Sequence, residues 1–222
     1  MCGRFTFVDI EDIRERFKTE PINLKPNYNV APTQDVPVII NDGTNHLAMF
    51  RWGLIPFWAK DPSIGNKMIN ARAEMVDEKP SFKHILQRKR CLVVADGFYE
   101  WKKEKFTKRP YRITLKNNEL FGFAGLWDTW KSPIGDIVNS CSIITTTPNE
   151  LMSPIHDRMP VILTRDSERV WLDQSIVDSH FLKNLLLPYP ADLMIAYEVS
   201  SLVNSTKNNG PECLVSVGSS LF

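Results

Sequence analysis

The sequence predicts an α+β fold, in which a single domain has a core of curved, mostly antiparallel, barrel-like β-sheet and a few peripheral helices. Many short runs of β-branched and aromatic residues are separated by turn residues, whereas few segments show helical spacing. Strands and helices also do not alternate as they would around a parallel sheet. The 222 residues, 43% of them hydrophobic, suffice for one substantial core and are few for two.

The N-terminal part of the chain predicts a helix, a loop and a hairpin. In DIEDIRERF (9–17) the apolar residues recur at helical spacing, and Asp9 is the expected N-cap. The prolines between Pro21 and Pro32 predict an extended loop. VPVII (36–40) and HLAMFRWGLI (46–55) predict two strands joined by a turn at NDGTN.

The rest of the chain predicts further strands and two helices. The expected strands are CLVVADGFYEW (91–101), PYRITL (110–115), LFGFAGLW (120–127), SCSIITT (140–146), MPVIL (159–163) and LMIAYEV (193–199). SERVWL (167–172) and DSHFLKNLLL (178–187) have helical spacing, and the second ends before Pro188. Residues 204–222, rich in Ser, Asn and Gly, predict a flexible tail of the same domain.

Composition excludes several classes of protein. The 27 basic and 26 acidic residues give a net charge of +1, so no global positive field attracts nucleic acid or an anionic membrane. The N-terminus contains no apolar core of signal-peptide length, and no later apolar run is as long as a membrane helix. The four cysteines and four histidines lack zinc-site spacing, which predicts free thiols in a reducing cytoplasm. Two basic runs, KHILQRKR and WKKEKFTKR, are typical of solvated faces.

Cys2 follows the initiator methionine directly, in MCGRFTF. Removal of Met1 would leave an α-amine, with an ordinary pKa of about 7.7 to 8.0, on the same residue as a thiol with an ordinary pKa of about 8.5. Such a residue can attack an amide as an N-terminal nucleophile. It can also capture an aldehyde as an imine that the thiol closes into a thiazolidine, a step favoured by intramolecular orientation. The alternative is that Cys2 is an incidental small residue.

Other polar residues stand in positions that suit chemistry. Glu100 ends the strand of DGFYEW, where partial burial would raise the pKa of its carboxyl, although an ordinary strand-end carboxylate is the alternative. NARAEM places Asn70 two residues before Arg72, and IHDRMPVIL places His156 two residues before Arg158. On extended backbone, side chains two residues apart share a face.

Aromatic residues suggest a surface for single-stranded DNA. RWGLIPFWAK carries Trp52 and Trp58 with Arg51 and Lys60 beside them. A tryptophan in a loop beside basic residues can stack on a base, although most tryptophans pack in cores.

Eight collinear motifs together resemble one known family. They are MCGRFT, YNVAPTQ, RWGLIPFWA, NARAEM, DGFYEW, FAGLWD, TTTPN and IHDRMPVIL, and they span most of the chain. In this order they resemble the SOS response-associated peptidase (SRAP) family, and within it a sensor and shield of abasic sites in single-stranded DNA. The resemblance implies that Met1 is lost and that Cys2 forms a thiazolidine cross-link with the ring-opened abasic sugar.

The resemblance also implies residue roles. Cys2 is the nucleophile, Asn70 positions the sugar and the Cys2 amine, Glu100 supplies acid and base help, and His156 assists proton transfer. The residues expected to contact DNA are Arg4, Asn29, Pro32, Trp52, Trp58, Arg72 and Arg158. No cofactor and no metal is implied.

The expected partner is single-stranded DNA with abasic sites, including sites at junctions with duplex DNA, bound by a cytoplasmic monomer that associates with the nucleoid through DNA. Three alternatives stay open. Class II glutamine amidotransferases also begin Met-Cys-Gly and hydrolyse glutamine. A module that binds single-stranded DNA without a covalent bond would need no thiol. A peptidase would cleave other proteins and not only release its own Met1.

Overall fold

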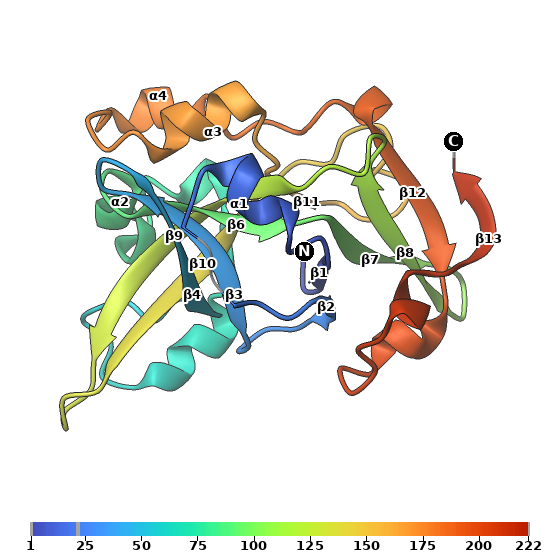
Figure 1. The fold of residues 1–222 in the computed structure, drawn as a ribbon, viewed down its shortest axis with the longest axis horizontal. Coiled ribbons are helices and arrows are strands. Elements are labelled where there is room, and N and C mark those ends of the chain that lie inside the picture. Colours follow the sequence, from blue (N-terminus) through green and yellow to red (C-terminus); the bar gives the residue numbers. More distant parts are fainter. Residues whose placement is uncertain (1, 21–22, 222) are drawn as a thin grey trace.

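The computed structural model describes residues 2–20 and 23–221, and its strands form two sheets within that part of the chain (Figure 1). The first sheet has the order β13-β12-β8-β7-β1-β2 and the second the order β11-β10-β4-β3-β6-β9. The strands are β1 (Phe5–Phe7), β2 (Asn27–Val30), β3 (Asp35–Asn41), β4 (Asn45–Trp52), β5 (Asn70–Arg72), β6 (Arg90–Ala95), β7 (Gly97–Lys103), β8 (Lys108–Leu115), β9 (Phe121–Lys131), β10 (Ile137–Thr146), β11 (Met159–Pro160), β12 (Met194–Val199) and β13 (Ser216–Leu221).

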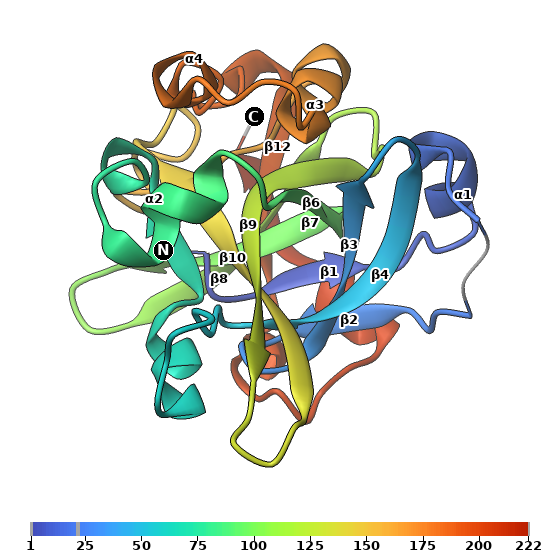
Figure 2. The same ribbon diagram turned by 90° about the vertical axis from the view of Figure 1, so that its left-hand side faces the viewer.

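The second sheet closes on itself. β10, β4, β3, β6 and β9 pair in turn, and β9 pairs back with β10, so these strands form a barrel (Figure 2). β4 and the short β5 run parallel to β10, whereas the other pairings are antiparallel. Because a closed sheet has no exposed edge, the barrel gives the fold a rigid centre. The predicted α+β class with a curved, mostly antiparallel core is confirmed.

Short helices cover the outside of the sheets. They are α1 (Asp12–Phe17), α2 (Pro80–Leu86), α3 (Arg165–Leu172) and α4 (Ser179–Lys183), with the 3₁₀ turns η1 (Pro62–Lys67), η2 (Ala73–Met75), η3 (Ala191–Leu193), η4 (Ser201–Asn204) and η5 (Pro211–Leu214). Figure 1 shows α3 and α4 side by side at one border of the molecule. Thr164 and Asp178 cap these two helices, because their side chains accept hydrogen bonds from the first turn.

Two apolar clusters make up most of the core. One joins the inner faces of the two sheets, where the Phe5 and Phe123 rings lie 5.8 Å apart and meet edge to face. It includes Cys2, which is therefore part of the packed interior. The other lies under the helices and includes Phe17, Leu86 and Trp171.

Several predicted boundaries are wrong. The predicted strand 46–55 ends at Trp52, because Gly53 has φ +131° and a side chain there would stand 2.6 Å from the Gly65 carbonyl oxygen. The predicted strand 91–101 is divided at Asp96 into β6 and β7. MPVIL contributes only the short β11.

The N-terminal helix is also shorter than predicted. α1 begins at Asp12 after Glu11, so Asp9 is not its cap, and the Asp9 backbone N–H instead donates to Asp96 at 3.4 Å. The predicted loop from Pro21 to Pro32 contains β2, which pairs with β1; residues 21–22 lie outside the described part.

The C-terminal segment, where the sequence predicts a flexible tail, contains regular elements in this structure. η5 buries Cys213, and β13 pairs with β12 at the edge of the first sheet. Between η4 and η5, the Asn208 side chain donates to the Leu202 carbonyl at 2.8 Å. These contacts bind residues 204–221 to the sheet that carries β1 and β7.

Candidate active site around Cys2

Cys2 lies at the point where the chain enters the first sheet. β1 pairs with β7 through Phe5 and Phe98, and the Tyr99 N–H continues the ladder to the Arg4 carbonyl at 2.9 Å. This register carries the residues before β1 alongside Glu100. The Cys2 side chain is fully buried.

Asn70 holds the backbone of Cys2. Asn70 is the first residue of β5 and is opposite Ile143 of β10, so the barrel wall fixes its position. Its Nδ2 donates to the Cys2 carbonyl at 2.7 Å. Its Oδ1 is buried and has no hydrogen-bond partner among the described residues. A buried acceptor without a partner is costly, and it is ready to receive a donor from a ligand.

The thiol of Cys2 is held in its protonated form. Burial raises its pKa well above the ordinary value, and the negative charge of Glu100 raises it further. The sulfur has a long, weak contact of 4.0 Å with the Arg4 carbonyl. Any reaction of this thiol therefore needs a group that accepts its proton.

Glu100 is a buried carboxyl whose proton is exchanged near neutral pH. It lies on β7, is 3% exposed, and burial raises its pKa from 4.5 to about 7. A carboxyl with a pKa near the working pH can both donate and accept a proton. The sequence-based expectation of a raised pKa agrees with this position.

His156 lies in the turn before β11, where burial lowers the pKa of its imidazole. The Arg158 backbone N–H donates to its Nδ1 at 3.0 Å, while Asp157 Oδ1 lies 2.9 Å from the same nitrogen. These two contacts require opposite roles of Nδ1. We take Nδ1 as the acceptor of the Arg158 backbone N–H, because Asp157 is 89% exposed and burial lowers the pKa of His156. The ring proton is then on Nε2.

Glu100 and His156 line one cleft. Its volume is about 310 Å³, and its other lining residues are Trp101, Lys103, Lys108 and Asn204. Larger hollows of about 430 and 650 Å³ lie beside α1 and α3 and contain none of the sequence-predicted residues. We therefore place the candidate site at the smaller cleft, next to Cys2.

The sequence interpretation missed Trp101, although it follows Glu100 directly. The Trp101 indole N–H donates to Asn204 Oδ1 at 2.7 Å, and the Arg4 guanidinium lies 5.8 Å from the ring centroid. These contacts fix the ring at the wall of the cleft. The only available signal was its place in DGFYEW.

The two predicted phosphate-binding arginines both lie beside Thr145 of β10. Arg72 ends β5 and is exposed, with Thr145 of β10 as its register partner. Arg158 forms a two-point ion pair with Glu74, with N–O distances of 2.7 and 3.0 Å, and also donates to the Thr145 carbonyl at 2.5 Å. In this structure, the fork of Arg158 already holds a carboxylate.

Trp52 is misassigned to a DNA channel. It is fully buried, its ring packs 5.1 Å from Phe5, and its indole N–H donates to the Ile69 carbonyl at 2.9 Å. Trp58 is 48% exposed, and its neighbour Phe57, which the sequence interpretation did not single out, is 64% exposed. The turn at Gly53 separates the two tryptophans.

Asn29 is a second misassignment, and it explains the position of Arg4. Asn29 is buried, and its Nδ2 donates to the carbonyls of Ser205 and Asn208 at 3.0 and 2.7 Å. Its Oδ1 accepts from Arg4 at 2.7 Å, and Arg4 also donates to the Val203 carbonyl at 2.7 Å. Both side chains therefore attach the C-terminal segment to β1 and β2. Pro32 follows β2 and is partly buried.

Replacing Asn29 should destabilise the fold. Asn29→Ala removes the amide donor of buried carbonyls and one of the acceptors of the Arg4 guanidinium, so we expect the free energy of unfolding to fall by about 2 to 4 kcal/mol in urea titrations. Asn139→Ala, at an exposed position, should change it by less than about 1 kcal/mol. Unchanged stability together with weaker DNA binding would restore Asn29 as a DNA contact.

Three further observations bear on the site. Among the described residues, no group of three or more His, Cys, Asp or Glu side chains is arranged to hold a metal ion. No helix in the same part of the chain is long and apolar enough to cross a membrane. All four cysteines are unpaired and buried.

Comparison with known proteins identifies the family. The model of the SOS response associated peptidase (SRAP) family matches residues 1–206. The abasic site processing protein YoqW of Bacillus subtilis is 56% identical, over 97% of this chain and 100% of YoqW. The abasic site processing protein HMCES of Xenopus tropicalis is 33% identical, over 87% of this chain and 67% of HMCES.

A solved structure has the same fold. The crystal structure of a protein from Bacteroides thetaiotaomicron superposes with a TM-score of 0.89 at 30% identity, and covers 97% of this chain and 100% of that chain. The eight motifs, the cleft beside Cys2 and these matches agree. The chain belongs to the SOS response-associated peptidase family.

Proposed function

We propose that this protein senses and shields abasic sites in single-stranded DNA by forming a covalent thiazolidine cross-link through Cys2 after Met1 is removed. The observation that carries the proposal is the arrangement of Cys2, whose backbone is held by Asn70 and whose thiol is affected by the charge of a buried, titrating Glu100. The names of YoqW and HMCES, abasic site processing proteins, support the choice of substrate.

The chemistry needs an amine and a thiol on one residue. The Cys2 amine adds to the aldehyde of the ring-opened sugar, and loss of one water gives an imine. The thiol then adds to the imine carbon, so that a C–S bond forms and the S–H proton passes to a base. Because the thiol is attached to the same residue as the imine, closure benefits from an effective molarity of about 10⁵ M or more.

The side chains of the site suit these proton transfers. Glu100 in its acid form donates a proton during ring opening and water loss, and in its base form accepts the thiol proton. The unpartnered Oδ1 of Asn70 can accept from the Cys2 amine or a sugar hydroxyl. His156 lines the same cleft, where its imidazole can assist proton transfer to the sugar.

Arg72 and Arg158 would hold the phosphates next to the lesion, and Trp58 would contact a neighbouring base. In this structure the Arg158 guanidinium is bound to the Glu74 carboxylate, so a phosphate has to displace that carboxylate. Phosphate contacts are independent of sequence, so we expect little base preference.

Glu74→Gln tests this competition. The amide removes the negative charge that Arg158 now neutralises, so affinity for intact single-stranded DNA should rise by about threefold or more in anisotropy titrations at low salt. Glu78→Gln, at a nearby exposed position, is the charge-matched control. Weaker binding by Glu74→Gln alone would show that Glu74 positions Arg158 instead.

The direct test uses single-stranded DNA with one abasic site, followed by denaturing electrophoresis and intact mass measurement. We expect a heat-stable adduct whose mass is that of the Met1-free protein plus DNA minus one water. Met1 removal by the protein itself would account for the peptidase activity in the family's name. Absence of an adduct, with Cys2-dependent ammonia release from glutamine, would support the amidotransferase alternative.

A separate measurement addresses the number of protein chains in the complex. We propose a monomer that reaches its lesion in the cytoplasm or the nucleoid, including lesions at junctions of single-stranded and duplex DNA. Light scattering before and after cross-linking should give the mass of one chain and of one chain with one DNA strand.

A further inference from the structure

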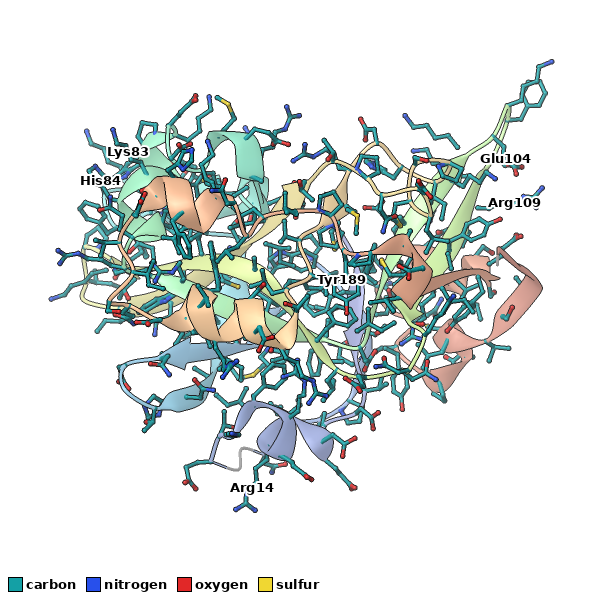
Figure 3. All side chains as sticks on the ribbon, turned by 90° about the horizontal axis from the view of Figure 1, so that it is seen from above. Arg14, Lys83, His84, Glu104, Arg109 and Tyr189 are labelled. Carbon is teal, nitrogen blue, oxygen red and sulfur yellow. The ribbon has the colours of Figure 1, made fainter. Side chains whose placement is uncertain are left out.

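The hairpin formed by β7 and β8 carries positive charge and an exposed ring that the chemistry at Cys2 does not use. Its lysines are Lys102, Lys103, Lys105 and Lys108. Phe106, in the turn, is 88% exposed, and the Lys105 ammonium lies 5.4 Å from its ring centroid. In Figure 3 the hairpin, marked by Glu104 and Arg109, projects from the body of the molecule.

On one face of the hairpin, like charges stand directly opposite each other. Lys103 of β7 pairs in register with Lys108 of β8, an arrangement that destabilises an antiparallel pair. Neither lysine takes part in an ion pair with a carboxylate in the described part of the chain. The hairpin therefore holds an unfavourable arrangement that an anion would relieve.

The opposite face shows the contrast. There Lys102 stands opposite Arg109, but Arg109 is paired with Glu104 at 3.0 Å and with Glu198 at 3.3 Å. Positive charge is thus balanced by carboxylates on one face and left unbalanced on the other. The two faces of the hairpin therefore differ in charge balance.

The unbalanced face borders the cleft of the candidate active site, while Glu100, two residues before Lys102, is on the other face of β7. Lys103 and Lys108 line the same cleft as Glu100 and His156. Trp101, two residues before Lys103, shares its face of the strand and lines that cleft too. The charge of Lys103 is also one of the smaller causes that lower the pKa of His156.

We propose that this face of the β7–β8 hairpin binds the DNA strand where it leaves the cleft, with Lys103 and Lys108 on either side of one phosphate and Phe106 stacked on a base beyond it. That the bound ligand is single-stranded DNA rests on the proposed function. Extended backbone from Glu100 to Phe106 spans roughly 20 Å, so the contact lies beyond the lesion itself. Lysines with an exposed ring suit single-stranded DNA, which offers both phosphates and unstacked bases.

The test is non-covalent binding of intact single-stranded DNA, about 16 and about 4 nucleotides long, at several salt concentrations. For the long strand, Lys103→Gln with Lys108→Gln should weaken binding about threefold to tenfold at low salt and reduce the salt slope by about 0.7. Phe106→Ala should weaken it about fivefold or more. Phe106 does not line the cleft, so Phe106→Ala should weaken binding of the short strand much less than binding of the long one.

Controls come from the same protein. Lys102→Gln lies on the balanced face, and Ile134→Ala removes an 87% exposed side chain from the β9–β10 hairpin; both should bind long DNA as the wild type does. Because the double variant relieves a repulsion, its thermal midpoint should stay equal or rise. Should it unfold instead, Phe106→Ala in the exposed turn still decides the question.

The proposal is overturned if the lysine and phenylalanine variants bind long DNA as tightly as the wild type, or if the two control variants weaken binding equally. The two control variants, Lys102→Gln and Ile134→Ala, should still form the adduct with abasic DNA at saturating concentration. A wild type that forms no adduct counts against the proposed chemistry only, since the hairpin is judged by binding of intact DNA.

Discussion

Cys2→Ser should abolish the heat-stable adduct with abasic DNA while the protein continues to bind the strand. The serine variant keeps the α-amine once Met1 is removed, so it can still form an imine. A hydroxyl is a much weaker nucleophile than a thiol, so the ring does not close and the imine hydrolyses on heating. Borohydride should nevertheless trap the imine of Cys2→Ser as a reduced adduct, which separates the two steps.

Two controls define this result. Cys213→Ala removes another buried thiol, outside the cleft, and should leave adduct formation intact. A chain that keeps one residue ahead of Cys2 retains the thiol but lacks the Cys2 amine, and should form no adduct. A heat-stable adduct from Cys2→Ser, or from the extended chain, would contradict the aminothiol mechanism.

The strands of this fold were largely predictable because their apolar runs reflect burial in a closed sheet. β2 was missed because the sequence around NYNV is rich in proline and because its pairing with β1 depends on residues far away in the chain. α2 was missed because its seven residues contribute only a short apolar spacing, and Pro80 at its first position is its clearest signal. Local sequence could not supply these contacts.

The same limit explains the errors in the site. Trp52 and Trp58 stand six residues apart in one motif, and only the turn at Gly53 sends one into the core and leaves the other half exposed. Asn29 looked like a DNA ligand because the sequence does not show that the C-terminal segment offers it three carbonyl groups. The motifs locate the reacting residues, whereas burial decides which of their neighbours can reach a ligand.

Glu100→Gln should slow adduct formation and at the same time stabilise the protein at alkaline pH. The amide cannot transfer a proton, so the rate of cross-linking should fall by about 10² to 10⁴-fold. In the wild type the rate should decline as pH rises through about 7, where Glu100 loses the proton that it donates. Single-turnover assays between pH 5 and 9 measure both effects, after correction for ionisation of the amine.

The stability effect follows from linkage between folding and ionisation. The folded state raises the pKa of Glu100 from 4.5 to about 7, so its stabilising influence is fully present below about 4.5 and is lost as pH rises to about 7. Glu100→Gln has no charge to bury. Its advantage over the wild type in urea unfolding should therefore grow across this range and level off near 3 kcal/mol at most, on the order of 1.4 kcal/mol per pKa unit. Glu150→Gln, at an exposed position, should show no such trend. An advantage independent of pH would mean that Glu100 does not titrate near neutrality, and that another group must supply the proton for ring opening.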